Sequence, residues 1–249
     1  MPVPNIERKV PSPNRSRKLP DVPLAFHLLA LLRTPLIMFI IVPLSFVVGL
    51  YEKFRNWYYY TFKSAPHLHE ERVKHVQAQV KAWHEGGRKK RLCTARSPAA
   101  GMNVRMPDFK DACNKIDVSS MRDVLEIDEE NMTVRLEPLV NMGYASRILI
   151  PKGYALCVLP EMDDLTIGGL VNGYGVSTQA HKHGTMHHNV VSFEIVLADG
   201  TFVKATPTNE HKDLFRAVFW AHGTLGIMVA VTVRITKVKP FVRMRYIPC

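Results

Sequence analysis

Four glycines stand close together in the stretch PEMDDLTIGGLVNGYGVST, residues 160–178, just after two acidic residues. They are Gly168, Gly169, Gly173 and Gly175. Glycine lacks a side chain and can adopt positive φ, so amide N–H groups in such a run can approach a polyanion and point at its oxygens. A pyrophosphate is the natural ligand for that arrangement. A glycine-rich turn or tight helix packing explains the spacing about equally well, so both interpretations stay open.

Two further segments are rich in small residues. CTARSPAAG, residues 93–101, carries Arg96, whose guanidinium can pair with phosphate. HGTLGI, residues 222–227, is a second glycine turn that leads into a strand, and by itself it is a weak signal. The sequence has no GxxxxGK[ST] motif and no GxGxxG at the end of an obvious strand, so neither a P-loop nor a Rossmann site is expected.

Two polar groups in the same region allow a catalytic or metal interpretation. One is a set of histidines in a single loop, which can chelate zinc or simply form a polar loop near a ligand: His181, His183, His187 and His188. The spacing of these histidines matches no structural zinc finger, so the polar-loop interpretation is favoured. Asp163 and Asp164 resemble an acidic catalytic pair, but acidic residues before a helix more often cap it.

The elements that must position these residues are mixed helices and strands. Helical spacing of apolar residues predicts an amphipathic helix over 68–85, ended by the glycines at 86–87. Residues 132–140 alternate as a half-buried strand does, and a helix is expected from Met142. Residues 191–206 form a hairpin pattern around Asp199 and Gly200, and 226–240 predict another strand. The expected architecture is an α+β layered domain.

The N-terminal part has a different composition. Residues 1–23 form a basic, proline-rich tail that cannot bury enough apolar surface to order itself. Residues 24–51 form a membrane segment, because Thr34 to Tyr51 carries no formal charge and is about long enough to span a bilayer. A re-entrant hairpin or a buried core helix is the alternative. Residues 52–66 are expected to be a linker, and the flanking basic residues lean weakly toward a cytosolic N-terminus.

Composition alone does not choose one class of function. The formal net charge of +11 suits an anionic partner such as a phospholipid surface, a nucleotide cofactor or nucleic acid. No basic motif interleaved with aromatic residues is present, so nucleic-acid binding is not expected. The four cysteines are far apart in sequence with no CxxC pair, which suggests neither a zinc ribbon nor a dithiol redox centre. They are interpreted as reduced cytosolic thiols, with two widely spaced lumenal disulfides as the alternative.

The order of several motifs resembles a known family. Six motifs follow one another along the chain: LCTAR, EPLVNMG, PEMDDLTIGGLVNGYG, HKHG, FEIVLADGTFV and DLFRAVFWAHGTLGIMVAVTVRI. This order resembles that of the Δ24-sterol reductases, which belong to the vanillyl-alcohol-oxidase-like FAD flavoproteins. The resemblance covers about residues 67–248 and includes the preceding membrane segment. It implies a two-subdomain α+β FAD-binding domain of the vanillyl-alcohol-oxidase/PCMH type over 67–240, preceded by an N-terminal transmembrane helix.

The resemblance also implies which residues contact FAD. The main FAD-contacting loop corresponds to Thr166, Ile167, Gly168, Gly169, Leu170, Val171, Asn172, Gly173, Tyr174, Gly175, Val176, Ser177 and Thr178. The pyrophosphate loop corresponds to Thr94, Ala95, Arg96 and Ser97. The late glycine turn corresponds to Gly223, Thr224, Leu225, Gly226 and Ile227. No residue is assigned a catalytic role.

The sequence departs from the family pattern in three places. Ala95 stands where a glycine is common, and His183 stands where HKYG has tyrosine. The first loop has no histidine placed for covalent flavin linkage, so FAD is expected to bind non-covalently. The family continues into a cap domain, of which residues 241–249 would be the start. The chain is accordingly expected to be either a fragment or a truncated product.

The function implied by the resemblance is NADPH-dependent, FAD-mediated reduction of the side-chain C24 double bond of a sterol. Membrane lipid and a sterol are the expected partners, and the expected location is the endoplasmic reticulum membrane, with one span and a cytosolic FAD domain. That orientation is opposite to the one that the basic residues flanking the span weakly favour, which has the N-terminus in the cytosol. The alternatives are an FAD-linked oxidase or dehydrogenase of the same fold, or an inactive membrane-bound flavin-binding remnant.

Overall fold

The computed structural model describes residues 31–95, 110–173 and 175–239, together with Phe241, Arg243 and Tyr246. The basic tail expected over 1–23 lies outside the described residues. The chain divides into two units between Lys63 and Ser64. The first unit contains the apolar helix, and the second contains the segments expected to bind a cofactor.

The described residues of the first unit form one continuous helix from Leu31 to Phe62, 32 residues long with a mean hydropathy of 2.2 in its most apolar window. By length and composition it can cross a membrane. A π-helical turn, η1 (Ile37–Ile41), precedes α2 (Val42–Phe62), and the Val42 N–H donates to the Ile37 carbonyl five residues back. Pro43 has no N–H to donate to the preceding turn, which accounts for this irregularity. Residues 52–62, expected to belong to a linker, continue the helix.

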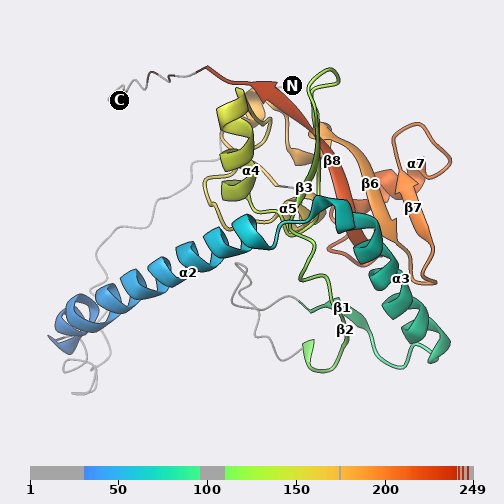
Figure 1. The fold of residues 1–249 in the computed structure, drawn as a ribbon, viewed down its shortest axis with the longest axis horizontal. Helices are drawn as coiled ribbons and strands as arrows, with labels where there is room; N and C mark the ends of the chain where they lie inside the picture. The colour runs from blue at the N-terminus through green and yellow to red at the C-terminus, as the bar shows by residue number, and fades with distance from the viewer. Residues whose placement is uncertain are drawn as a thin grey trace, which may run out of the picture. The chain divides into compact units, whose positions relative to one another are not determined.

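The second unit is built on an antiparallel sheet (Figure 1). Its strands run in the order β3 (Val124–Asp128), β4 (Thr133–Leu136), β8 (Ile227–Lys237), β6 (Val190–Val196) and β7 (Phe202–Ala205), while β5 (Tyr154–Leu156) pairs with the far end of β8. The long strand β8 therefore bonds to β4, β5 and β6. The predicted hairpin is confirmed as β6 and β7, and Gly200 takes the left-handed conformation in its turn.

Alternation along the strands gives the sheet one apolar face. Leu136 of β4 and Phe193 of β6 both pair with Val231 of β8, and all three side chains are fully buried. The rings of Phe193 and Phe215 lie 5.2 Å apart, which packs α7 (Lys212–Val218) against this face. The other face carries polar side chains from the intervening positions, as a half-solvated antiparallel sheet does.

A smaller, parallel sheet joins β1 (Leu92–Thr94) to β2 (Asn114–Ile116). The helix α3 (His69–Glu85) supplies Val73, Val76 and Val80 to a core shared with Ile116 and Val229. This helix confirms the amphipathic segment predicted over 68–85, and it ends at Gly86 as expected. The α3 valines thus link the small sheet to the large one.

Short helices complete the second unit. They are η2 (Pro66–Leu68), α4 (Met142–Leu149), η5 (Ile150–Lys152), α5 (Ile167–Asn172), α6 (Ala180–His183) and η6 (Met186–Asn189). The helix predicted from Met142 is confirmed as α4, and the Asn141 side chain caps it by accepting a hydrogen bond of 2.7 Å from the Tyr144 N–H.

Candidate functional site

The glycine-rich helix α5 is held against the segment that follows β4. The Ile167 N–H donates to the Val140 carbonyl at 2.8 Å, and the Gly168 N–H donates to the Pro138 carbonyl at 2.9 Å. A Cβ at Gly168 would lie only 2.9 Å from that Pro138 oxygen, so this position requires glycine. Thr166 occupies the N-cap position, which corrects the expectation that Asp163 or Asp164 caps the helix.

Most of the glycine amides in this run are hydrogen-bonded within the chain. The Gly173 N–H donates to the Gly169 carbonyl at 2.9 Å, and the Gly175 N–H donates to the Leu170 carbonyl at 2.8 Å. A Cβ at Gly175 would approach the Leu170 side chain to 2.9 Å. Together with Gly168, three of the four glycines therefore serve close packing. At the exposed fourth, Gly169, a Cβ would meet only the Thr166 hydroxyl, at an ordinary 3.4 Å.

Asn172 joins this helix to the late glycine turn. Its Nδ2 donates to the Gly168 carbonyl at 2.8 Å, and its Oδ1 accepts a hydrogen bond of 3.2 Å from the Gly223 N–H. The Asn172 carbonyl also accepts from the His222 N–H at 3.4 Å. Two of the three segments predicted to contact the cofactor, 166–178 and 223–227, are thereby brought side by side. The sequence contains both segments but gives no sign of this bridge.

The late turn has an unusual backbone. Trp220 and His222 adopt positive φ of 66° and 49°, and Gly223 has φ of 77°. Left-handed conformations are uncommon for residues other than glycine and cluster at functional sites. The turn is closed by Thr224, whose N–H and Oγ1 both donate to the Ala221 carbonyl, at 2.9 and 2.7 Å. A Cβ at Gly223 would meet nothing within 4 Å, so this backbone faces open space.

The first predicted loop is described only at its start. Thr94 ends β1, and the Ala95 N–H donates to the Ile116 carbonyl at 2.8 Å. Arg96, Ser97 and Tyr174, all assigned to the cofactor, lie outside the described residues.

The other assigned residues differ in exposure. The side chains of Thr166, Ile167, Val171 and Ile227 are buried in the protein, so only their backbone can reach a ligand. Those with exposed or partly exposed side chains are Leu170, Val176, Ser177, Thr178, Thr224 and Leu225. Among the described residues, no group of three or more histidine, cysteine or acidic side chains is arranged to hold a metal ion.

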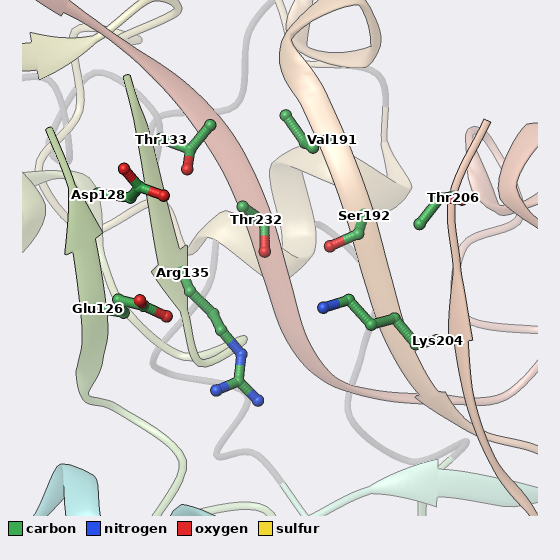
Figure 2. A pocket seen from close by; sticks show the side chains of 9 residues that line it. All are labelled: Glu126, Asp128, Thr133, Arg135, Val191, Ser192, Lys204, Thr206 and Thr232. Carbon is green, nitrogen blue, oxygen red and sulfur yellow. The ribbon is translucent and has the colours of Figure 1, made fainter. Parts of the chain in front are cut away.

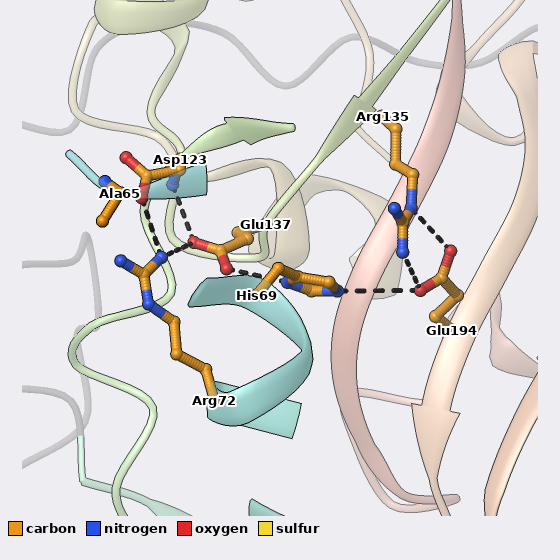
Figure 3. A network of polar contacts seen from close by, with 7 residues as sticks. All are labelled: Ala65, His69, Arg72, Asp123, Arg135, Glu137 and Glu194. Atoms are coloured by element: carbon orange, nitrogen blue, oxygen red, sulfur yellow. Dashed lines mark hydrogen bonds and ion pairs between the residues drawn. The ribbon is translucent and has the colours of Figure 1, made fainter. Parts of the chain in front are cut away.

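A buried ionic network supports the segment on which α5 rests (Figure 3). The fully buried Glu137 accepts hydrogen bonds from Arg72 NH1 at 2.9 Å and from the Asp123 N–H at 2.8 Å. Arg72 NH1 also pairs with Asp123 Oδ2 at 2.8 Å, and His69 Nδ1 lies 2.8 Å from Glu137 Oε1. Since Glu137 directly precedes Pro138, the network fixes the backbone that packs against Gly168.

The network continues across the sheet to Glu194. Arg135 holds this carboxylate with two hydrogen bonds of 2.8 and 2.6 Å. His69 Nε2 lies 3.7 Å from Glu194 Oε2, which is an ion-pair contact too long for a hydrogen bond, and Nε2 is hydrogen-bonded to none of the described residues. With His69 protonated, three cationic groups balance the three carboxylates of the network.

Burial and charge act in opposite directions on these groups. Burial favours a lower pKa for His69, but its contacts with Glu137 and Glu194 outweigh this and leave the pKa raised above 6.5. Burial would raise the pKa of Glu194, but contacts with His69 and Arg135 dominate and lower it from 4.5 to about 2. Both groups therefore favour their charged forms in the folded protein.

These pKa shifts predict a pH dependence of stability. Because the pKa of Glu194 is lowered, its ionised carboxylate stabilises the folded protein at pH values above 4.5. This contribution, about 3 kcal/mol, is lost as the pH falls from 4.5 to about 2. The raised pKa of His69 contributes stability below pH 6.5, which is lost as the pH rises through the raised value. Urea denaturation of the full chain in detergent, repeated from pH 3 upward, measures the slope, with Glu194→Gln as the comparison. An equal acid slope in Glu194→Gln would contradict the assignment.

Two cavities lie apart from the glycine segments. One, of about 280 Å³, is a trough on the polar face of the sheet with mixed charges (Figure 2), lined by Glu126, Asp128, Thr133, Arg135, Val191, Ser192, Lys204, Thr206 and Thr232. The other, of about 810 Å³, includes Lys182, His183 and His188 and reaches Arg234. No residue assigned to the cofactor lines either cavity, whereas two histidines of the polar loop line the second.

Comparison with known proteins identifies close sequence relatives. A family model described as an FAD binding domain matches residues 71–206. The human Delta(24)-sterol reductase is 43% identical over 208 residues, covering 84% of this chain and 40% of that protein. A Delta(24)-sterol reductase homolog of Caenorhabditis elegans is 37% identical over 97% of this chain and 46% of that protein. The chain thus spans less than half the length of these curated relatives, and the resemblance to Δ24-sterol reductases is confirmed.

Solved structures share the fold at lower identity. A chitooligosaccharide oxidase matches with a TM-score of 0.56 and 22% identity, over 66% of this chain and 34% of that one. The 6-hydroxy-D-nicotine oxidase of Arthrobacter nicotinovorans matches with a TM-score of 0.53 and 20% identity, over 65% of this chain and 34% of that one. Together with the family match, they confirm the predicted α+β fold of the vanillyl-alcohol-oxidase/PCMH type.

Proposed function

Because this chain belongs to the FAD-binding domain family, we propose that it forms the membrane-attached, FAD-binding part of an NADPH-dependent reductase acting on the side-chain C24 double bond of a sterol. The observation that carries the proposal is the 43% identity to the human Delta(24)-sterol reductase over 84% of the chain.

The residues present suit a dinucleotide with a pyrophosphate. Gly169 and Gly223 are exposed glycines at which the backbone can approach a ligand, and at Gly223 the space a Cβ would enter is open. Asn172 holds these two segments together. The net charge of +11 favours an anionic cofactor. We assign non-covalent FAD to this surface, with Thr94 and Ala95 at its edge.

The chain's own residues bind and position the reactants in this proposal. FAD, when bound, supplies the carrier that passes hydride from NADPH to the alkene. The Asn172 bridge and the packing of Gly168 on Pro138 keep the cofactor-facing backbone in one arrangement, which limits reorganisation during the reaction. No residue of this chain is assigned as the proton donor.

The apolar helix Leu31–Phe62 suits a sterol substrate. Sterols partition into bilayers rather than into water, so a domain attached to the membrane meets its substrate at high local concentration. We propose a single span in the endoplasmic reticulum membrane with the FAD domain in the cytosol, where NADPH is present. Protease protection of tagged chains in microsomes tests this: a protected C-terminal tag would contradict it.

Replacing Gly169 by leucine is expected to weaken FAD binding at least tenfold, a cost of about 1.4 kcal/mol. Gly169 lies in a helix, is exposed and has room for a Cβ, so the variant is expected to fold while its side chain covers the bare backbone. Flavin absorbance after gel filtration measures occupancy, and circular dichroism checks folding. Gly49→Leu, on the apolar helix, is the matched control. A folded Gly169→Leu protein with full flavin occupancy would rule out the assignment.

The reaction is tested separately from cofactor binding. The chain, loaded with FAD in liposomes that contain a sterol with a C24 double bond, is supplied with NADPH, and the product is followed by mass spectrometry. The proposal expects a product heavier by two hydrogen atoms. Flavin reduced instead by an alcohol or lactone and reoxidised by oxygen would indicate an oxidase of the same fold. Bound FAD without any turnover would indicate a flavin-binding remnant.

A further inference from the structure

The small parallel sheet brings two cysteines together that are distant in sequence. Cys93 is the middle residue of β1 and pairs with Lys115 of β2, and Cys113 immediately precedes β2. Since side chains alternate along a strand, Cys113 and Lys115 lie on the same face as Cys93. The neighbouring positions Leu92 and Ile116 point the other way, into the core with α3. The two cysteines therefore occupy the outer face of the small sheet.

The two thiols interact directly, and both are reachable. Neither cysteine is in a disulfide, and both side chains are partly exposed, whereas Cys157 is buried. Burial raises the pKa of the Cys93 thiol, and its charge repulsion with Cys113 and a hydrogen bond between the two side chains raise it further. The register of β1 and β2 places Cys113 on the adjacent strand, two residues before the partner of Cys93, where the two side chains are diagonal neighbours. The side chains of Lys110 and Lys115 oppose this rise in pKa.

We propose that Cys93 and Cys113 form a redox-active dithiol, a modification site at which a small-molecule disulfide such as glutathione disulfide oxidises the pair to an intramolecular disulfide. One thiolate attacks the small disulfide, forms a mixed disulfide and releases one glutathione thiolate. The second protein thiolate then attacks the protein sulfur of that mixed disulfide and releases the second. The protein loses two electrons and two protons, and glutathione disulfide becomes two molecules of glutathione.

The position of the pair gives the modification a consequence for cofactor binding. Cys93 directly precedes Thr94 and Ala95, which the proposed function places at the edge of the FAD site. A bond to Cys113 would link the middle of β1 covalently to the residue just before β2. The oxidation itself requires only the two cysteines, so its test stands independently of whether the chain binds FAD.

Reactivity is expected to depend on pH. A raised pKa leaves the Cys93 thiol mostly protonated near neutrality, and the thiolate is the attacking form. The rate of disulfide formation should therefore rise continuously between pH 7 and pH 9.

The experiment uses the full reduced chain in detergent, treated with glutathione disulfide and then alkylated with N-ethylmaleimide. Trypsin releases Cys93 in LCTAR, residues 92–96, and Cys113 in DACNK, residues 111–115. The expected result is a cross-linked LCTAR–DACNK peptide in most of the protein, with the intact chain lighter by two hydrogen atoms. Reduction should return both peptides to the alkylatable form.

Matched serine variants separate the proposed pair from other cysteines. Cys93→Ser and Cys113→Ser should each abolish the cross-linked peptide and leave a stable mixed disulfide with glutathione on the remaining partner. Cys157→Ser should leave the cross-link unchanged, because that residue follows β5 and is buried. Glutathione on both cysteines of the wild-type chain, or cross-links to other cysteines or other molecules, would overturn the proposal.

Discussion

Replacing Arg72 by methionine is expected to lower the free energy of unfolding by about 3–5 kcal/mol, because removing one partner leaves buried carboxylates without a counter-charge. Arg72 NH1 contacts both Asp123 and Glu137, at 2.8 and 2.9 Å, and Glu137 is fully buried. Methionine keeps the apolar stem of the side chain but removes the guanidinium. Urea denaturation of the full chain in detergent, followed by circular dichroism, measures the change.

Two further variants distinguish charge from packing at this position. Lys74→Met, an exposed cation on α3, should change stability by less than about 0.5 kcal/mol. Arg72→Lys keeps the positive charge but lacks the planar guanidinium with its several N–H donors, so an intermediate loss of stability is expected. A methionine variant as stable as the wild type would show that the carboxylates are neutralised in some other way.

Replacing Gly226 by alanine is the second change with a large expected effect. A Cβ here would lie 2.6 Å from Ile195 Cγ2 and 2.7 Å from the Val196 carbonyl oxygen, and that backbone oxygen cannot move aside as a flexible side chain could. Relief of the clash must push β8 away from β6 where Ile227 pairs with Val196. The expected loss of stability is about 3 kcal/mol. Thermal unfolding by circular dichroism measures it.

The same displacement should reach the late glycine turn, because Gly226 lies two residues after Thr224. Flavin occupancy is therefore expected to fall together with stability. Gly49→Ala is the control, since a Cβ at Gly49 meets nothing within 4 Å and this residue lies on the apolar helix, outside the segments assigned to FAD. If Gly226→Ala melts at the wild-type temperature, the strands must already be far enough apart to accept a methyl group.

Elements with a strong local pattern could be predicted from the sequence. The spacing of Val73, Val76 and Val80 defines α3, and the double glycine after Glu85 ends it. Alternation around Asp199 and Gly200 defines the β6–β7 hairpin, since the turn residues and strand period agree there. The FAD-binding fold followed from the order of several motifs, which is a family signal and not a local one.

The arrangement of the site could not be predicted, because it depends on contacts between distant residues. Asn172 meets Gly223 across 51 positions, and Glu137 meets His69 across 68. The glycine run allows two interpretations, bare backbone for a phosphate or tight packing, and no spacing rule reveals that at Gly168 the neighbour that excludes a side chain is Pro138. The proximity of Cys93 and Cys113 could not be predicted either, since only the register of β1 and β2 brings them together.

The place of β8 in the sheet has a consequence for biosynthesis. Among the strands of this sheet it is the last to leave the ribosome, yet it is the partner of β4, β5 and β6. Until Lys237 has emerged, those three earlier strands have unsatisfied pairing edges, and the nascent polypeptide exposes them to aggregation or to chaperones. Assembly of this sheet should therefore be a nearly all-or-none event that begins only once β8 has emerged.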